Sequence, residues 1–109
     1  MSARILIADD EDSLRWVLEK GLTQAGYQVT AVQDGEAAVR AFEAEPFDLV
    51  FLDVKMPGMD GLEALQRIKA VSETLPVVII SGHGNVETAV RATKLGAFDF
   101  IEKPLEREP

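Results

Sequence analysis

Five short apolar segments alternate with helical patterns along the 109-residue chain, and this alternation constrains the fold more than any other feature. The predicted strands are residues 5–8, 27–32, 49–52, 77–80 and 98–101. Strands that alternate with helices form βαβ units, which build a parallel sheet covered by helices. The sequence therefore predicts one domain, residues 1–109, with an α/β fold.

The polarity of the strands indicates their order in the sheet. Segments 5–8, 49–52 and 77–80 are apolar throughout, as expected for strands that helices cover on both faces. Segments 27–32 and 98–101 also contain polar residues, which suits the two edges. Three central strands, two edge strands and right-handed crossovers lead to the flavodoxin-like order 2-1-3-4-5 with helices on both faces.

Four helices are predicted between the strands, and their ends carry capping signals. Apolar residues from Leu14 to Ala25 recur at helical spacing. Asp34 and Asp60 are candidate N-caps of the second and third helices, and Gly96 follows the fourth. The predicted helices span residues 14–25, 36–45, 61–71 and 86–95.

Composition and charge exclude several classes of function. The chain has no cysteine, and therefore no disulfide and no thiolate metal site. Its net charge of −8 argues against direct binding of nucleic acid, because phosphate backbones attract basic surfaces. Its apolar runs are too short to span a membrane, and its N-terminus lacks the apolar stretch of a signal peptide. We therefore expect a cytoplasmic protein.

Polar side chains follow the strands at the ends where ligands bind in this topology. They are Asp9 and Asp10 after the first strand, Asp53 after the third, Ser81 after the fourth and Lys103 after the fifth. Because the carboxyl ends of parallel strands share one edge, three carboxylates, a hydroxyl and an ammonium group are expected to converge there. Such a cluster is a candidate site for chemistry.

The converging carboxylates predict a bound cation. Each like-charged pair costs about 4 kcal/mol at roughly 4 Å and an effective dielectric constant of about 20. A divalent ion would neutralise the excess negative charge, and all-oxygen ligands favour Mg²⁺. The alternative is that Asp9, Asp10 and Glu11 form a solvated loop that caps the following helix.

A carboxylate beside a metal ion and an ammonium group is a candidate phosphoryl acceptor. Asp53 would attack phosphorus to form an acyl phosphate, with Mg²⁺ and Lys103 offsetting charge on the transferring oxygens. Two interpretations stay open for Ser81. Its hydroxyl can donate a hydrogen bond to a phosphoryl oxygen, or it can simply end its strand as a turn residue.

These elements together resemble the receiver domain of a bacterial response regulator, the CheY-like partner in a two-component system. The matching parts are the Asp9-Asp10 pair, "LDVKMPGMDG", Ser81 after an apolar strand, and "GAFDFIEKP". The segments "DSLRWVLEKGL" and "MPGMDGLEAL" are most similar in sequence to the NtrC-like group. Receivers of that group precede an output ATPase and a DNA-binding domain.

The resemblance implies a role for each residue of the acidic cluster. Asp53 would accept phosphate from a phosphohistidine on a sensor histidine kinase. Asp10, Asp53 and the backbone carbonyl of Lys55 would hold Mg²⁺, and Asp9 would act partly through water. Such a domain is a signalling phosphoacceptor and catalyses only its own phosphorylation and dephosphorylation.

The resemblance also implies a conformational switch. Lys103 would contact the phosphoryl group, and the Lys103-Pro104 peptide would be cis. Ser81 and Phe100 would be the switch pair: the hydroxyl moves toward the phosphate, and the aromatic side chain rearranges behind it.

Two single residues have alternative interpretations. His83 is the only histidine, and we interpret it as an ordinary loop residue in preference to a catalytic or metal-binding one. Trp16 lies on the side of the first helix opposite its apolar stripe, where it either marks a partner surface or is an isolated exposed aromatic residue.

Only five residues follow Pro104, too few for the fifth helix that receivers normally place beside the first. The sequence therefore predicts a receiver shortened after its fifth strand. Apolar surface on the first helix and the sheet is then expected to be exposed, and a homodimer is one way to cover it.

Three other functions have requirements that can be compared with this sequence. A haloacid-dehalogenase-type phosphatase needs an acid two residues after its nucleophile, where this chain has Lys55. A flavodoxin needs a phosphate-binding loop after the first strand, where this chain is acidic. A degenerate receiver that works only as an interaction or dimerisation module is the main alternative, although the acids, hydroxyl and lysine are all present.

Overall fold

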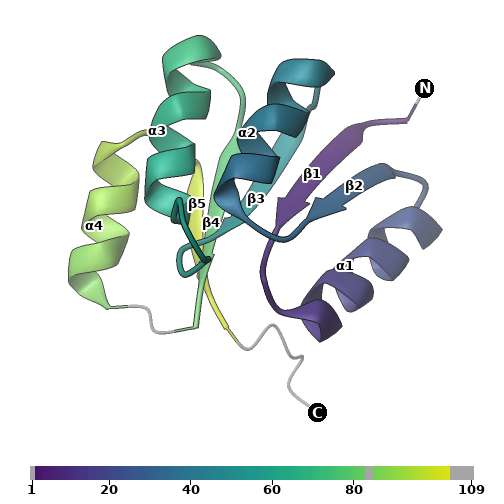
Figure 1. Cartoon of the computed structure of the whole chain (residues 1–109), viewed down its shortest axis with the longest axis horizontal. Helices are drawn as coiled ribbons and strands as arrows, with labels where there is room; N and C mark the ends of the chain where they lie inside the picture. The colour runs from purple at the N-terminus through teal and green to yellow at the C-terminus, as the bar shows by residue number, and fades with distance from the viewer. Residues whose placement is uncertain (1, 83–84, 104–109) are drawn as a thin grey trace.

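The computed structural model describes residues 2–82 and 85–103, which form a parallel sheet with helices on both faces (Figure 1). Its strands are β1 (Arg4–Ala8), β2 (Gln28–Val32), β3 (Leu49–Asp53), β4 (Val77–Ser81) and β5 (Asp99–Glu102). The described helices are α1 (Asp12–Gln24), α2 (Gly35–Ala44), α3 (Gly61–Val71) and α4 (Val86–Lys94). The strand order is β2-β1-β3-β4-β5, which confirms the predicted topology.

The predicted boundaries of most elements shift by one or two residues, while those of α3 agree. β3 includes Asp53 and β4 includes Ser81, because Asp53 pairs with Ile80 and Ser81 with Glu102 across the sheet. Hydrogen bonding therefore continues one residue beyond the apolar run on each of these strands. β5 lies one residue later than predicted, from Asp99 to Glu102.

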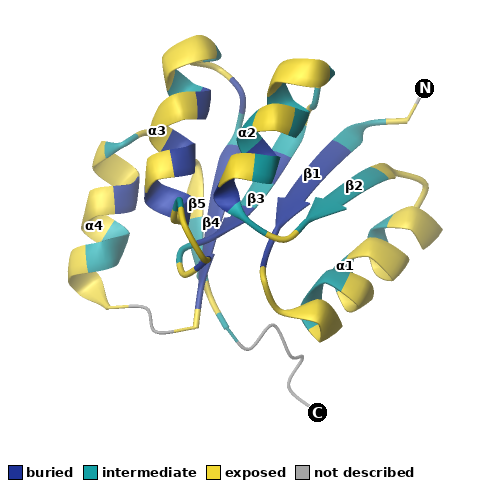
Figure 2. Ribbon diagram, in the orientation of Figure 1, coloured by how far each residue is buried: buried dark blue, intermediate teal, exposed yellow. Residues whose placement is uncertain are grey.

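The main hydrophobic core lies between the sheet and the α2–α3 layer. Alternate residues of the central strands point into it, since side chains of a strand alternate between its two faces. Figure 2 shows these strands as the most deeply buried part of the chain. The strand residues of this core are Leu6, Ala8, Val50, Leu52, Val77 and Ile79, and they pack with Ala38, Leu62, Leu65 and Ile68 from the helices.

Helix α1 lies on the opposite face of the sheet, as the right-handed crossovers from β1 to β2 and from β3 to β4 require. It packs against β1 and β2, yet none of its residues is fully buried. Val17, which belongs to its apolar stripe, is exposed. Trp16 is 61% exposed, and the Lys20 ammonium lies 4.7 Å from the centre of its ring. Exposed apolar surface on this helix agrees with expectation.

Three of the four described helices begin with a side chain that accepts a hydrogen bond from the backbone of the first turn, and two of these N-caps were predicted. The side chains of Asp34 and Asp60 accept hydrogen bonds from the backbone of Ala37 and Glu63. Asn85 does the same for α4.

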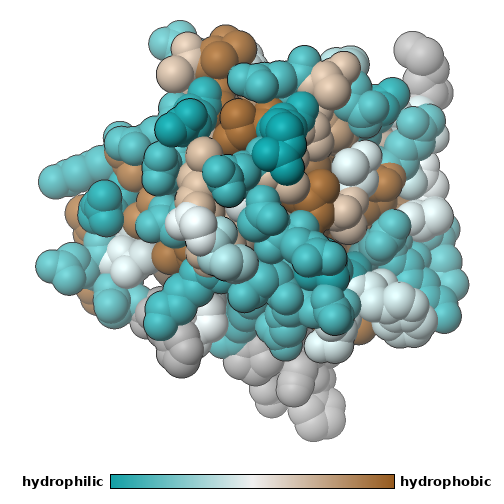
Figure 3. All heavy atoms as spheres, viewed as in Figure 1, coloured by the Kyte–Doolittle hydropathy of each residue, from teal (hydrophilic) through white to brown (hydrophobic). Residues whose placement is uncertain are grey.

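Hydrophilic side chains cover most of the surface seen in Figure 3, and small hydrophobic areas show between them. Within the described ranges, no helix has the length and apolar character of a membrane span.

Candidate functional site

The strand register brings the predicted site residues to one edge of the sheet. Ala8 pairs with Leu52, so Asp9 and Asp53 leave neighbouring strands side by side. Asp9 is 0% exposed and Asp53 is 4% exposed, whereas Asp10 is exposed. The solvated-loop alternative is therefore wrong for Asp9, because its position on the edge of the core removes it from water.

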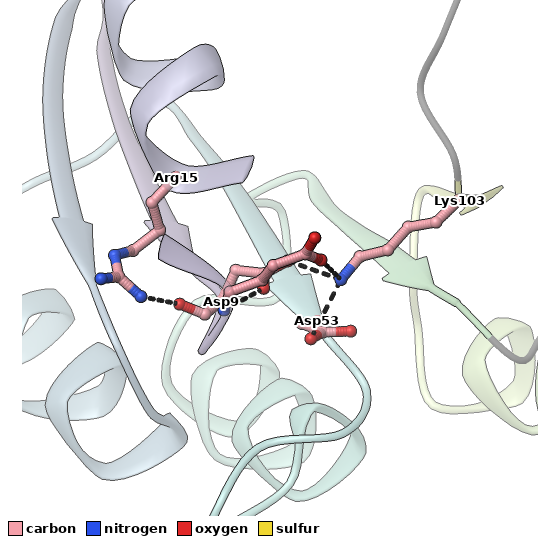
Figure 4. Close-up of polar contacts among 5 residues, drawn as sticks. Asp9, Arg15, Asp53 and Lys103 are labelled. Carbon is pink, nitrogen blue, oxygen red and sulfur yellow. Dashed lines mark hydrogen bonds and ion pairs between the residues drawn. The ribbon is translucent and has the colours of Figure 1, made fainter. Parts of the chain in front are cut away.

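Lys103 directly follows β5 and reaches across β4 to the acids (Figure 4). Its Nζ lies 3.0 Å from Asp9 Oδ2 and 3.3 Å from Asp53 Oδ2. The backbone N–H of Lys103 donates to the Ser81 carbonyl at 2.8 Å, which anchors the start of this side chain to the sheet. The ammonium group therefore lies between the two buried carboxylates, as predicted.

Two residues of the site were missed by sequence reasoning. Glu11 Oε1 lies 3.3 Å from Lys103 Nζ, whereas the sequence indicates for Glu11 only a place in a solvated loop. Arg15 Nη1 donates to the backbone carbonyl of Asp9 at 2.6 Å. The signals for them were weak: Glu11 adjoins the acid pair, and Arg15 lies one helical turn after Asp12.

The cluster has the composition and spacing of a site for a hard metal ion. Asp9, Asp10 and Asp53 each offer a carboxylate oxygen, and these oxygens lie within 4.8 Å of one another. Oδ2 of Asp9 is buried and accepts no hydrogen bond from the described residues; its contact with Lys103 is an ion pair outside hydrogen-bond geometry. A cation would satisfy this oxygen, so the residues fit a divalent ion.

The buried charges of the cluster shift its proton affinities. Burial, followed by the charge of Asp9, raises the pKa of Asp53 from 3.8 to about 6, although Lys103 opposes the shift. Burial acts to lower the pKa of Lys103, but its ion pairs with Asp9 and Asp53 outweigh this, and the pKa lies above its ordinary value. Both groups therefore hold their protons more tightly than they would in water.

A shallow cleft of about 230 Å³ lies over the acceptor, so Asp53 can be reached from solvent by a small group. Lys55 lines this cleft from the loop after β3 and is exposed. The full lining consists of Asp10, Glu11, Asp53, Lys55, Gly82 and Lys103. The cleft therefore brings together the acids, the ammonium group and a second lysine.

The remaining predicted site residues lie either behind the cleft or outside the residues that the structure describes. Ser81 is buried at the end of β4, and Phe100 packs against the main core from β5. The predicted loop role of His83 and the predicted cis Lys103-Pro104 peptide lie outside the described residues.

Residues 5–109 match the family model described as "Response regulator receiver domain". The chain belongs to this family. Two-component response regulators carry receiver domains of this kind, which are signalling domains. The acid pair, the buried Asp53 and Lys103 therefore belong to a receiver, as the sequence resemblance implied.

Known relatives of the receiver include transcriptional regulators. The chain is 42% identical over 100 residues to the DNA-binding transcriptional regulator NtrC of Klebsiella pneumoniae, covering 92% of this chain and 21% of NtrC. It is 45% identical over 102 residues to the transcriptional regulatory protein FixJ of Bradyrhizobium diazoefficiens, covering 94% of this chain and 50% of FixJ. The chain thus spans between a fifth and a half of these curated relatives.

A solved receiver has the same fold. The crystal structure of the receiver domain of NtrX from Brucella abortus superimposes with a TM-score of 0.86 at 44% sequence identity. The match covers 94% of this chain and 87% of that structure. The comparison supports the NtrC-like character of the chain and does not favour a degenerate interaction module.

Proposed function

We propose that Asp53 accepts a phosphoryl group from a phosphohistidine of a sensor histidine kinase. The observation that carries this proposal is the position of Asp53: a buried carboxylate beneath an open cleft, between two further acids and the Lys103 ammonium. The carboxylate is thus buried yet open to a small group, with a cation at 3.3 Å. The family match supports the same chemistry.

In the proposed reaction an oxygen of ionised Asp53 forms a bond to phosphorus. The bond from phosphorus to the kinase imidazole nitrogen breaks, and its electron pair stays on the nitrogen. Lys103 offsets negative charge on the transferring oxygens, because its ammonium already lies beside Asp53. The backbone bond from Lys103 to Ser81 keeps the base of that side chain in place.

Asp10, Asp53 and the backbone carbonyl of Lys55 would hold Mg²⁺, with Asp9 acting partly through water. When bound, Mg²⁺ supplies positive charge to the carboxylates and the phosphoryl oxygens. Asp9 is fully buried, and its Oδ2 accepts no hydrogen bond from the described residues, so it can accept one from a water on the ion, which suits an indirect role. Asp10 is exposed and available for a direct one.

Mg²⁺ is expected to stabilise the folded protein, because a ligand that binds only the native state shifts unfolding by mass action. At a hundredfold excess over its dissociation constant, the gain is about 2.7 kcal/mol. Asp10→Asn should remove most of this gain with little effect on the metal-free protein, since Asp10 is exposed. Denaturant unfolding of wild type and Asp10→Asn, each in Mg²⁺ and in EDTA, measures the gain from Mg²⁺ and the stability of the metal-free protein.

Glu43→Gln is the matched control, because it removes one negative charge from an exposed position on α2. It should keep the full response to Mg²⁺. An equal loss of response in Asp10→Asn and Glu43→Gln would show that the ion acts through net charge and not through this site.

The proposal extends to the switch and its output. Ser81 would move its hydroxyl toward the phosphoryl group, and Phe100, two strand positions from Glu102, would rearrange behind it. Ser81 and Glu102 are paired across β4 and β5, which provides a direct route between the site and the edge strand. The phosphorylated domain would control an output ATPase and DNA-binding domain in a longer cytoplasmic regulator.

Self-association is a further part of the proposal. α1 contains no fully buried residue, and both Trp16 and Val17 on it are exposed. A second copy would cover such apolar area. Light scattering at high protein concentration should then give more than the monomer mass, and a monomeric mass there would contradict it.

The phosphoacceptor role is tested by incubation with acetyl phosphate followed by intact-mass measurement. Wild type should gain the mass of one phosphoryl group in the presence of Mg²⁺ and none in EDTA. Asp53→Asn should gain none under either condition. An adduct that persists in Asp53→Asn, or a wild type that never gains one, would contradict the proposal.

A further inference from the structure

The Arg15 guanidinium joins the end of β1 to the first turn of α1 (Figure 4). Its Nη1 donates to the Asp9 carbonyl at 2.6 Å, and its Nη2 pairs with the Asp12 carboxylate. The Arg15 side chain is only 14% exposed, whereas that of Asp12 is 89% exposed. Of the two contacts of Arg15, the one with the Asp9 carbonyl is therefore the better shielded from solvent.

The bond to Asp9 completes a set of contacts around the acid pair. The Asp9 N–H donates to the Val32 carbonyl at 3.1 Å, and Asp9 Oδ1 accepts from the Glu11 N–H at 2.8 Å. Arg15 holds the carbonyl of the peptide that links Asp9 to Asp10. Because a peptide is planar, fixing this carbonyl also fixes the direction in which the chain enters Asp10.

We propose that Arg15 is a positioning residue for the metal site: by holding the Asp9–Asp10 peptide, it orients both carboxylates toward Asp53. This inference rests on the proposed Mg²⁺ site. Mg²⁺ requires near-ideal octahedral geometry, so its affinity is sensitive to ligand placement. Residues that orient metal ligands without touching the ion typically change metal affinity by about 10- to 100-fold when they are replaced.

A purely electrostatic role for Arg15 predicts the opposite result. Arg15 is positively charged and contacts Asp9, which belongs to the proposed Mg²⁺ site. If charge alone mattered, removing the charge of Arg15 would strengthen Mg²⁺ binding. Removing an orienting contact would weaken binding. The sign of the change in the dissociation constant therefore distinguishes the two roles.

Isothermal titration with Mg²⁺ of folded wild type, Arg15→Met and Arg15→Lys provides the test. Arg15→Met is expected to weaken binding by about tenfold. Arg15→Lys keeps the charge but lacks the planar fork that reaches two acceptors at once, so it should also bind more weakly than wild type. Lys20→Met, which removes a charge from an exposed site on the same helix, should bind as wild type does.

Unchanged or tighter binding by Arg15→Met would overturn the inference. If Arg15→Met does not fold, Arg15→Lys decides, and affinity equal to that of wild type would overturn it as well. A wild type that binds no Mg²⁺ would overturn both this inference and the proposed metal site. Weaker binding by Asp10→Asn together with unchanged binding by Arg15→Met would overturn the role of Arg15 alone.

Discussion

Gly61→Ala is expected to destabilise the protein by about 3 kcal/mol or more, since overpacking against backbone forces the chain itself to move. A Cβ atom at position 61 would lie 2.0 Å from the carbonyl oxygen of Asp53 and 2.8 Å from its carbonyl carbon. The Gly61 N–H also donates to the Val54 carbonyl at 2.9 Å, which holds the two segments together. Chemical denaturation measures the loss.

The same clash is expected to impair the site in any Gly61→Ala protein that still folds. The atoms in the way belong to the backbone of the proposed acceptor, so relief of the overlap displaces Asp53. Mg²⁺ affinity should therefore fall together with stability, and titration with Mg²⁺ on the folded fraction measures it.

Gly21→Ala is the matched control for this substitution. Nothing lies within 4 Å of a Cβ at position 21, which is exposed within α1. Alanine should therefore stabilise that helix by about 0.5 to 1 kcal/mol through its higher helix propensity. If Gly61→Ala proved as stable as Gly21→Ala, the close approach of α3 to the acceptor strand would be wrong.

Asp53→Asn is expected to stabilise the metal-free protein at neutral pH by about 2 to 3 kcal/mol, because one pKa unit corresponds to about 1.36 kcal/mol. The pKa of Asp53 is raised from 3.8 to about 6, chiefly by burial and then by Asp9, so ionised Asp53 opposes folding. Asparagine has almost the same shape and removes the charge. Lys103 keeps its ion pair with Asp9 in the variant.

The pH dependence of this stabilisation follows from proton binding. Between pH 3.8 and about 6, native Asp53 binds its proton more tightly than unfolded Asp53. Wild type therefore loses stability as pH rises through that window, and Asp53→Asn lacks this loss. The difference in unfolding free energy should be near zero at the acid end and reach its full value above the window.

Asp99→Asn serves as the control, because Asp99 is an exposed carboxylate on β5. Asn at this position removes one exposed negative charge without touching the buried cluster. Denaturant unfolding in EDTA at a series of pH values measures all three proteins. An Asp53→Asn protein less stable than wild type at neutral pH would contradict the account of a destabilising buried charge.

The fold could be predicted because its strands differ clearly in polarity. The apolar runs ending at Ala8, Leu52 and Ile80 indicate central strands, and right-handed crossovers leave few possible orders. The same logic places Asp53 and Lys103 at one edge, although they are fifty residues apart in the chain. Topology alone therefore predicted that the two would converge.

Contacts that depend on loop path and side-chain direction could not be predicted. The spacing of Arg15 and Asp12 indicates a helical pair, but the bond from Arg15 to the Asp9 carbonyl depends on how the chain turns between β1 and α1. Glu11 reaches Lys103 for the same reason. The sequence indicates Gly61 only as a helix start, because a close approach between distant backbones leaves no periodic pattern.

The exposure of α1 shows a second limit. Periodicity identifies its apolar stripe, yet Val17 within that stripe is exposed. The spacing of apolar residues indicates which side of a helix is apolar but not how closely that side is covered. Coverage depends on the neighbouring elements, which the pattern of one helix does not contain.

The identity of the phosphorylated residue tests the central claim most directly. Borohydride reduces an aspartyl phosphate to homoserine, so protein treated with acetyl phosphate and Mg²⁺ can be reduced, digested and mapped by peptide mass. The account predicts homoserine at position 53 in wild type, and none anywhere in the chain when Mg²⁺ is replaced by EDTA. Homoserine at position 9 or 10, or an unmodified Asp53 in protein that carries the phosphoryl mass, would contradict it.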